Sequence, residues 1–469
     1  MNQNKNTGKT ICIIGTGIGG LTAGAFLTQQ GYHVTLFEKE QLLGGRALSL
    51  DGSSLTLDNY TQLLSAFHMD IPFAEPSLDI LFDKKMLAGY TLDLGFHAIG
   101  GGVVSNLKHI LSSLNEHIDM LESRLAYIKN GSFDYPFLSL SDKMKMLPNI
   151  LRLMLAGEST MKQLDSVSMS DTIKKYGKGK MKLTLEIFPR VIATINNLDI
   201  ISSGETFRAQ KNLLKGSKAV GYPKHGLQSI SQALADFIKR HGGEIHFQKP
   251  VTKIVIEDNK ATGAVIGDEE RYFDTIVSNV PVQNLFGIAH EKYFPSEYVK
   301  NIKSLQGTGS LCAYYSLNHV DPHLLGKSFL FIERDAGVDG DDAVGMIDFI
   351  TALPDTGLAL PNAHLVQAYI ICTPKEAQTK KTLEHLREIL ENKVKSLIPR
   401  FHSQLQWALY PAVWQLDGVA KTIDQVKPEI TTPVDNLYLV GDCVKAPGIG
   451  INCALNSAKK FQTIFSGST

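Results

Sequence analysis

Short apolar runs alternate with helix-like segments at the start of the chain. The run Ile11–Ile14 contains no charged residue and is typical of a strand buried on both faces of a parallel sheet. A segment of helical composition follows and ends at Gly31, and a second run, His33–Phe37, predicts another strand. Strand, helix and strand in this order indicate a parallel βαβ unit.

The turn between the first predicted strand and the helix carries three spaced glycines, Gly15, Gly17 and Gly20. In a G-x-G-x-x-G pattern the first glycine permits a sharp turn, the second lets the backbone approach a pyrophosphate, and the third lets helix and strand pack closely. Free N–H groups at a helix N-terminus also attract phosphate charge. We therefore predict a dinucleotide site at this turn, with Ile18 and Gly19 at the start of the helix.

Glu38 stands at the end of the second predicted strand, 18 positions after Gly20. A carboxylate at this place can accept hydrogen bonds from both ribose hydroxyls of an adenosine and would repel a 2′-phosphate. Strand, glycine turn, helix and acid together make the dinucleotide interpretation much more specific than the glycines alone.

The residues after Glu38 resemble a flavoprotein superfamily that includes amine oxidases, phytoene desaturases and carotenoid isomerases. Its E-K-x(4)-G-G-R stretch is similar to Glu38-Lys39 through Gly44-Gly45-Arg46 here. The resemblance implies FAD as the cofactor, with Glu38, Lys39, Gly45 and Arg46 beside it. The arginine would balance phosphate charge.

The far end of the chain resembles the C-terminal flavin motif of the same superfamily. A strand predicted at Asn436–Val440 is followed by Gly441 and Asp442, and a helix is predicted from about Cys453. The resemblance implies that Asp442 accepts hydrogen bonds from the ribityl chain or lies near the pyrophosphate. It also implies backbone contacts to the flavin or adenine from a few residues: Gly450, Ile451 and Asn452 at the flavin N1–C2=O2 edge, and Val251 at the adenine.

Two further stretches resemble the superfamily in the middle of the chain. Gly89–His97 is similar to its G-x-x-x-D-x-G-x-H stretch, which implies a place along the flavin ring. His97 is our candidate catalytic residue, since an imidazole can donate to the flavin or the substrate or shuttle a proton; the alternative is a structural hydrogen bond. Gly221–Gly226 departs from the family pattern, because His225 stands where a second glycine is usual.

These patterns predict an α/β protein of two discontinuous domains. Residues 9–100, 221–284 and 414–469 would form a Rossmann-type FAD-binding domain, and residues 101–220 and 285–413 a mixed α+β substrate domain. Residues 49–86 are interpreted as a helical excursion with its own small core, or alternatively as a lid over an apolar channel. A hairpin is predicted from strands at 251–257 and 260–266, and a helix from about 374 to 397.

One predicted helix in the substrate domain has an apolar stripe mixed with cations. The apolar residues recur at helical spacing, and Lys143, Lys145 and Arg152 lie among them; the stripe comprises Met144, Leu147, Leu151, Met154 and Leu155. Such a stripe is usually part of a core. The alternative is a helix that lies on a membrane surface, with its cations near lipid phosphates.

Composition excludes several classes of protein. Hydrophobic residues make up 43% of the chain and the formal net charge is zero, so no basic excess exists to bind nucleic acid. The chain starts without the apolar segment of a signal peptide and has no run of 18 apolar residues, so we expect no transmembrane helix. Five cysteines without a CxxC suit a reducing cytoplasm, and we expect a cytoplasmic protein, with or without peripheral membrane contact, and no metal site.

The predicted activity follows from the cofactor and from one missing side chain. Amine oxidases of the resembling superfamily have an aromatic residue in the C-terminal motif, whereas Gly448–Ala454 has none. We therefore expect an FAD-dependent oxidoreductase that desaturates, saturates or isomerises an apolar isoprenoid or polyene, with hydride transfer at flavin N5 and oxygen, a quinone or NAD(P) as electron acceptor. The alternatives are a flavin amine or amino-acid oxidase, and a non-catalytic prenyl-binding protein of the GDP-dissociation-inhibitor type.

Overall fold

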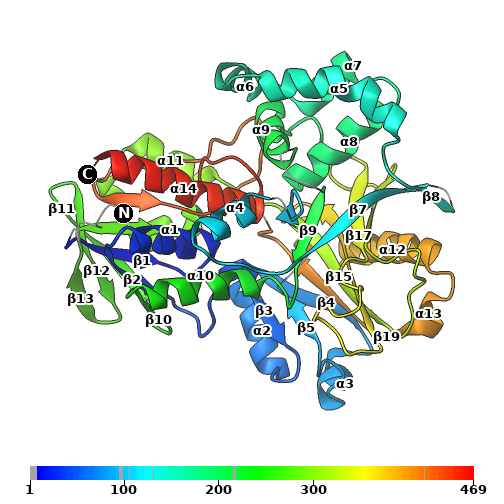
Figure 1. Ribbon diagram of the computed structural model, residues 1–469, viewed down its shortest axis with the longest axis horizontal. Helices are drawn as coiled ribbons and strands as arrows, with labels where there is room; N and C mark the ends of the chain where they lie inside the picture. Colours follow the sequence, from blue (N-terminus) through cyan, green and yellow to red (C-terminus); the bar gives the residue numbers. More distant parts are fainter. Residues whose placement is uncertain are drawn as a thin grey trace.

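Two β-sheets organise the molecule and lie towards its opposite ends (Figure 1). The computed structural model describes residues 8–94, 99–103, 105–129, 131–214, 218–416 and 418–468. In Figure 1 the N-terminal strands and the C-terminal helix lie together on the left, and most of the middle of the chain lies on the right and at the top.

The sheet on the left has five strands that all run parallel. Their order across the sheet is β10 (Glu244–His246), β2 (His33–Phe37), β1 (Thr10–Ile14), β14 (Thr275–Ser278) and β20 (Leu437–Leu439). The central strand β1 is apolar because it is covered on both faces, and Ile11, Cys12 and Ile13 are fully buried. Helix α1 (Ile18–Gln29) packs against both α10 (Gln228–Arg240) and α14 (Gly450–Ser468).

The predicted hairpin is confirmed as part of a small antiparallel sheet. Strands β11 (Val251–Glu257) and β12 (Lys260–Ile266) pair, and β13 (Glu269–Tyr272) extends the sheet. Asp258 and Asn259 form the two-residue turn with φ values of 46° and 62°. Asp and Asn tolerate this left-handed backbone, which matches the twist of the two strands.

The sheet on the right has ten strands and collects segments from five regions of the chain. In order they are β4 (Met69–Glu75), β19 (Leu405–Val413), β15 (Gly309–Leu317), β18 (His364–Cys372), β17 (Ala343–Asp348), β16 (Lys327–Glu333), β7 (Met120–Lys129), β9 (Val220–Pro223) and β6 (Ile99–Gly100), with β8 (Ser132–Asp134) paired to β7. Helix α12 (Lys380–Leu397) packs on this sheet through buried leucines such as Leu386 and Leu390. It starts six residues later than predicted, because residues 376–378 form a 3-10 turn.

Residues 69–75 form a strand, which differs from the prediction for this region. We expected residues 49–86 to be a helical excursion with its own core, and α2 (Leu57–Ala66) and α3 (Leu78–Asp83) are indeed helices. Strand β4, however, pairs with β19 at the edge of the ten-stranded sheet, so this part of the interpretation is wrong. Met69, Ile71 and Phe73 share one face of this strand, and Pro72, which has no N–H to donate, suits an edge strand.

The apolar stripe of the substrate domain is also not core. It belongs to α5 (Leu140–Leu155), which lies with α6 (Glu158–Leu164), α7 (Met169–Tyr176), α8 (Lys180–Ala193) and α9 (Ser203–Leu213) in a helical layer at the top of Figure 1. Only Met146 of α5 is buried. The remaining elements are the short strands β3 (Ser49–Asp51) and β5 (Thr91–Asp93), helices α4 (Asn106–Ser113), α11 (Ser296–Ser304) and α13 (Phe401–Gln404), and the 3-10 turns η1 (Gly45–Ala47), η2 (Val282–Gly287), η3 (Glu291–Tyr293) and η4 (Glu376–Gln378).

Asp348 makes the stability of this sheet depend on pH. It lies at the end of β17, is 1% exposed, and accepts a hydrogen bond of 2.8 Å from the Ile350 N–H. Burial raises the pKa of its carboxyl to about 7. The folded protein therefore holds a proton that the unfolded chain releases near pH 4.

When the pH is raised from 5 to 8, the free energy of unfolding is expected to fall less in an Asp348→Asn variant than in the parent. In the parent the free energy of unfolding falls as pH rises from the unfolded to the folded pKa, by about 3 kcal/mol between pH 5 and pH 7, and is flat above the folded pKa. The asparagine has no proton to release, so this part of the pH dependence disappears. Thermal melts of both proteins at the two pH values measure it, and parallel changes in the melting temperature would contradict the assignment.

Candidate functional site

The predicted site residues of the two chain ends meet at one edge of the parallel sheet. Three residues directly follow the carboxyl end of a strand: Gly15 after β1, Glu38 after β2 and Asn279 after β14. Gly441 lies two residues after the end of β20. Strand β1 lies between β2 and β14, so the connections leave it in opposite directions across the sheet. Ligands of open parallel sheets bind outside the carboxyl ends of the strands at such a switch point.

The glycine turn packs directly against the C-terminal motif. Gly15 has a φ of 93°, which a glycine adopts without strain, and Gly17 is the N-cap of α1. A Cβ atom on Gly19 would lie 2.8 Å from the Gly441 backbone nitrogen, closer than real Cβ atoms approach. The two motifs, more than 400 residues apart in the sequence, are therefore in contact.

Asn279 is a site residue that sequence reasoning missed. A Cβ atom on Gly17 would lie 2.6 Å from its Nδ2 atom, and one on Gly19 would lie 2.6 Å from its Oδ1 atom. Its side chain thus lies over the glycine turn and next to Gly441. A polar residue at the carboxyl end of a strand was the available signal, but the strand had first to be placed beside β1.

Glu38 is held in position by the glycine turn itself. It is 7% exposed, and its Oε2 atom accepts hydrogen bonds from the Thr16 N–H at 2.8 Å and the Thr16 hydroxyl at 2.7 Å. Its Oε1 atom accepts from the Glu40 N–H at 3.0 Å and keeps capacity for one more donor. The Lys249 N–H donates to the Glu38 backbone oxygen at 2.8 Å, which brings the start of β11, with Val251, towards the same place.

Lys39 is not brought into this group. Its side chain is 62% exposed and pairs with Glu40 at 3.3 Å. By contrast, the glycines after it lie against the turn: the Gly44 N–H donates to the Thr16 oxygen at 3.0 Å, and a Cβ atom on Gly45 would lie 3.4 Å from the Gly17 Cα. The G-G-R stretch therefore contacts the glycine turn through its backbone.

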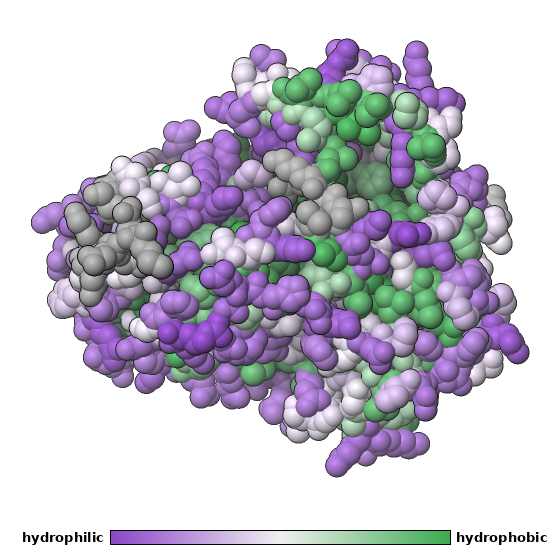
Figure 2. Space-filling model, viewed as in Figure 1, coloured by the Kyte–Doolittle hydropathy of each residue, from purple (hydrophilic) through white to green (hydrophobic). Residues whose placement is uncertain are grey.

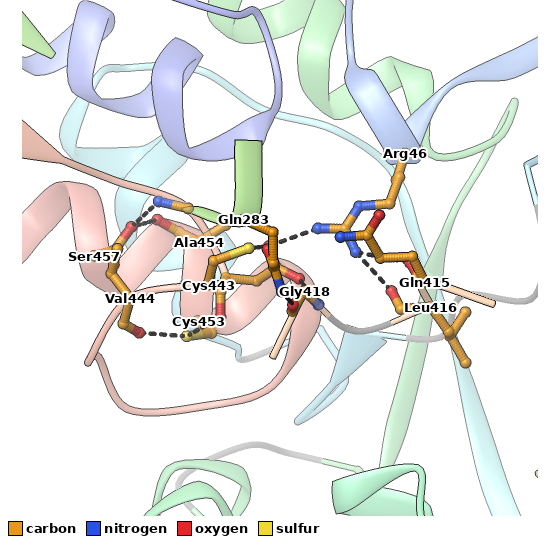
Figure 3. A network of polar contacts seen from close by, with 12 residues as sticks. Arg46, Gln283, Gln415, Leu416, Gly418, Cys443, Val444, Cys453, Ala454 and Ser457 are labelled. Carbon is orange, nitrogen blue, oxygen red and sulfur yellow. Dashed lines mark hydrogen bonds and ion pairs between the residues drawn. The ribbon is translucent and has the colours of Figure 1, made fainter. Parts of the chain in front are cut away.

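Arg46 and Asp442 form an ion pair between the two motifs. The Arg46 Nη2 atom lies 2.6 Å from the Asp442 Oδ1, and its Nη1 atom donates to the Leu416 oxygen at 2.8 Å (Figure 3). Burial by itself would raise the pKa of Asp442, but the Arg46 charge and the Gly418 N–H donor outweigh burial and hold this pKa below its ordinary value. Asp442 is thus an anion fixed beside a cation.

The N-terminus of α14 begins at Gly450, three residues earlier than predicted, so that Gly450, Ile451 and Asn452 form its first turn. The Asn452 Nδ2 atom donates to the Gly100 oxygen at 3.0 Å. Its Oδ1 atom is buried and has no hydrogen-bond partner among the described residues. A buried acceptor without a donor is costly, so this atom fits a bound group that donates to it.

A cavity of about 800 Å³ extends from this first turn to the helical layer. Gly450, Ile451 and Asn452 line one part of it, and the rest is lined mainly by apolar side chains of the ten-stranded sheet and of α5, α8 and α9, among them Phe137, Met146, Phe188, Leu213, Leu330 and Met346. Within the described residues, the charged side chains that line it are Arg124, Lys143 and Lys218, and no carboxylate or imidazole does.

The Asp93 side chain connects β5 to residues of two other segments of the chain. Its side chain accepts hydrogen bonds from the Ser49 hydroxyl at 2.5 Å, the Leu227 N–H at 3.2 Å and the Tyr222 hydroxyl. Burial raises the pKa of this carboxyl to about 6 against these hydrogen bonds. The predicted catalytic His97 lies outside the described residues, so its role stays a prediction.

His225 stands where the resembling family usually has a glycine. Its backbone has a φ of 65°, the left-handed region that the usual glycine would adopt. The Gly226 that follows has a φ of 91° and leaves room for Ser49 and Asp93. Two successive residues of this turn, His225 and Gly226, thus have a left-handed backbone.

The described residues contain neither a helix that could span a membrane nor a cluster of metal-binding side chains. Of the helices that the structure describes, none has both the length and the apolar character needed to cross a bilayer. In the same residues no group of three or more His, Cys, Asp or Glu side chains is placed to hold a metal ion.

Solved structures with the same fold include an oxidoreductase, a putrescine oxidase and a Rab GDI. An oxidoreductase from Methanosarcina mazei has a TM-score of 0.73 at 21% identity and covers 97% of this chain and 100% of its own. A putrescine oxidase bound to putrescine has a TM-score of 0.65 at 13% identity, with 98% and 99% of the two chains covered. A Rab GDI from Plasmodium falciparum has 0.54 at 14% identity, with 98% and 99% covered.

Relatives by sequence carry desaturase and isomerase names. A 1-hydroxycarotenoid 3,4-desaturase from a Flavobacterium strain is 24% identical over 70% of this chain and 67% of its own length. The 15-cis-phytoene desaturase of Solanum lycopersicum is 23% identical over 93% and 73%, and the prolycopene isomerase of Arabidopsis thaliana is 22% identical over 94% and 81%. Residues 18–460 match the family described as flavin containing amine oxidoreductase. The chain belongs to this family and is a flavin-dependent oxidoreductase.

Proposed function

We propose that the chain binds FAD and acts on carbon–carbon bonds of an apolar, isoprenoid-like or polyene substrate. The parallel sheet, with its glycine turn and the acid after the second strand, would be the Rossmann-type half that holds the adenosine. Bound FAD would supply hydride transfer at N5, which the side chains of this chain cannot supply. The residues present fit this cofactor, because the buried Asn452 Oδ1 atom has no donor among the described residues and could accept a hydrogen bond from the cofactor.

The protein would bind the cofactor through groups that are already in place. The N–H groups at the start of α1 would hold the pyrophosphate, and the free capacity of Glu38 Oε1 would accept a ribose hydroxyl. The N–H groups at the start of α14 favour negative charge on a ring placed against them. The apolar cavity next to this turn would orient the substrate and exclude water.

The residues that line the cavity are the main support for an apolar substrate. Its wall is mainly apolar, and its charged lining residues, within the described part of the chain, are cations. A protonated amine would lose its hydration there and would find no carboxylate among these described lining residues, which is unfavourable. A long hydrocarbon loses nothing by the same transfer. The names of the desaturase and isomerase relatives support the same class.

The experiment is an anaerobic mixture of oxidised holoenzyme with candidate polyenes, followed by the visible absorption of the bound flavin. Bleaching by a polyene supports desaturation. Isomerisation or saturation is tested with the dithionite-reduced enzyme and product analysis.

Bleaching by an amine, with hydrogen peroxide released in air and no response to polyenes, would overturn the proposal in favour of an amine oxidase. Colourless protein that takes up no FAD would favour a binding protein. Reoxidation by oxygen, a quinone or NAD(P)⁺ identifies the electron acceptor.

A Val191→Trp variant is expected to weaken substrate binding at least about tenfold without loss of flavin. Val191 lines the cavity from α8 and is half-buried, so the larger ring would fill space that the substrate needs. Val299→Trp, at a half-buried position on α11 outside the cavity lining, is the matched control. The dissociation constant of the substrate and the flavin content per chain are measured for both. Equal substrate affinities would show that the substrate does not bind in this cavity.

A further inference from the structure

The outer face of α5 is a continuous row of large exposed apolar side chains. Leu140, Met144, Leu147, Leu151 and Leu155 are 78%, 62%, 41%, 52% and 84% exposed. They recur at intervals of three or four residues and so share one side of the helix. Figure 2 shows hydrophobic surface gathered over α5 at the top of the molecule. Single exposed leucines are common, but a row of five on one helix indicates a surface that binds something.

Helix α5 is firmly held, so the row is not the result of a loose segment. Ser139 and Asp142 form a capping box at its start, in which each side chain accepts a hydrogen bond from the backbone N–H of the other. At its end the Lys211 Nζ atom donates to the Ala156 oxygen at 2.7 Å. The adjoining helices α6 and α9 are joined by Arg208, which contacts Asp165 at 2.6 Å.

Cations surround this row. Residues 140–182, which run from α5 to the start of α8, contain nine lysines and arginines but four aspartates and glutamates, whereas the whole chain has 47 of each. Of the four acids, one caps α5 and two pair with Arg208. Lys143, Lys145 and Arg152 lie on α5 itself and are exposed. An apolar row flanked by cations is complementary to a bilayer with anionic headgroups.

The cavity reaches the same helix. Lys143, Met146 and Ile150 line it, and they lie roughly a quarter-turn round the α5 axis from the exposed row. The loop before α5 also lines the cavity through Tyr135 and Phe137. A surface on which α5 rests would therefore lie next to the wall of the cavity.

We propose that the α5 face docks on a lipid bilayer that carries anionic headgroups. The five apolar side chains enter the boundary between headgroups and acyl chains, and the lysines and Arg152 contact lipid phosphates. The helix lies in the plane of the membrane and does not cross it. A substrate dissolved in the bilayer then reaches the cavity beside Met146 and Ile150 without passing through water. This last step rests on the proposed function, whereas docking does not.

The test is flotation of the purified holoenzyme with vesicles. The parent is expected to float with vesicles of phosphatidylcholine and phosphatidylglycerol, more weakly with phosphatidylcholine alone, and less as salt rises, because screening weakens the lysine contacts. Leu151→Gln is expected to reduce partitioning about tenfold, because one buried leucine side chain is lost from the interface. Tyr272→Gln, at a position 66% exposed on β13, is the matched control and should float like the parent.

Other outcomes overturn the proposal. Failure of the parent to float with anionic vesicles, or flotation of a Leu147→Gln/Leu151→Gln/Leu155→Gln variant as strongly as the parent, removes the docking surface. If the row instead joins two copies of the chain, the parent runs as a dimer in light scattering, the triple variant runs as a monomer, and neither floats. Flotation and light scattering need no enzymatic turnover. Their results therefore test membrane docking even if the proposed substrate class is wrong. Faster reaction of vesicle-borne than of detergent-dispersed polyene tests substrate entry separately.

Discussion

A Gly17→Val variant is expected to bind FAD at least about 100-fold more weakly than the parent, which corresponds to about 2.7 kcal/mol. Gly17 is the N-cap of α1, a Cβ atom on it would lie 2.6 Å from the Asn279 amide, and the Gly45 backbone approaches it from the other side. Two branched methyl groups would fill the space through which a pyrophosphate reaches the helix N-terminus. Titration of the apoprotein with FAD, followed by flavin fluorescence, measures the loss.

The control for this variant is Gly287→Val. Nothing lies within 4 Å of a Cβ atom at Gly287, which stands at the end of the turn η2, so the same side chain is added in open space. Circular dichroism and the melting temperature without FAD show whether each variant is folded. A folded Gly17→Val protein with the parent's affinity for FAD would show that the pyrophosphate does not bind at this turn.

An Asp442→Asn variant is expected to lose about 2 kcal/mol of stability and to bind FAD more weakly. The change keeps the size of the side chain but removes the carboxylate charge that pairs with Arg46, and both side chains are largely buried, at 22% and 14% exposed. Because Asp442 has a pKa below its ordinary value, its contribution is present above the unfolded pKa and is lost as the pH falls through the folded one. Chemical unfolding at neutral pH with and without FAD measures both effects.

The Glu269→Gln variant is the matched control for the ion pair. Glu269 pairs with Arg271 at 2.9 Å, but the two side chains are 65% and 43% exposed, so the loss of this pair should leave the stability nearly unchanged. An Arg46→Met/Asp442→Asn double variant should lose less stability than the sum of the single variants, because the two opposite charges are removed together. Equal losses for Asp442→Asn and Glu269→Gln would mean that the link between the two chain ends contributes little.

The sequence by itself determined the local structure around the two motifs. Strands β1 and β2, helix α1 and the hairpin β11–β12 were predicted closely, because apolar runs, a helix stop and a two-residue turn act through neighbours in the chain. The glycines and Glu38 were placed for the same reason. The contact of the glycine turn and Arg46 with Gly441 and Asp442 was expected only through resemblance to a family, and the structure shows it.

The tertiary structure decided which residues meet across the sheet and which faces are covered. Asn279 became a site residue because β14 lies beside β1, a pairing of distant segments that local pattern does not encode. Strand β4 joined the ten-stranded sheet in the same way. The row on α5 has the spacing of a core helix, and only the absence of a packing partner on its outer side, within the described residues, distinguishes it. Periodicity specifies one apolar face of a helix, but burial depends on what the rest of the chain leaves to cover it.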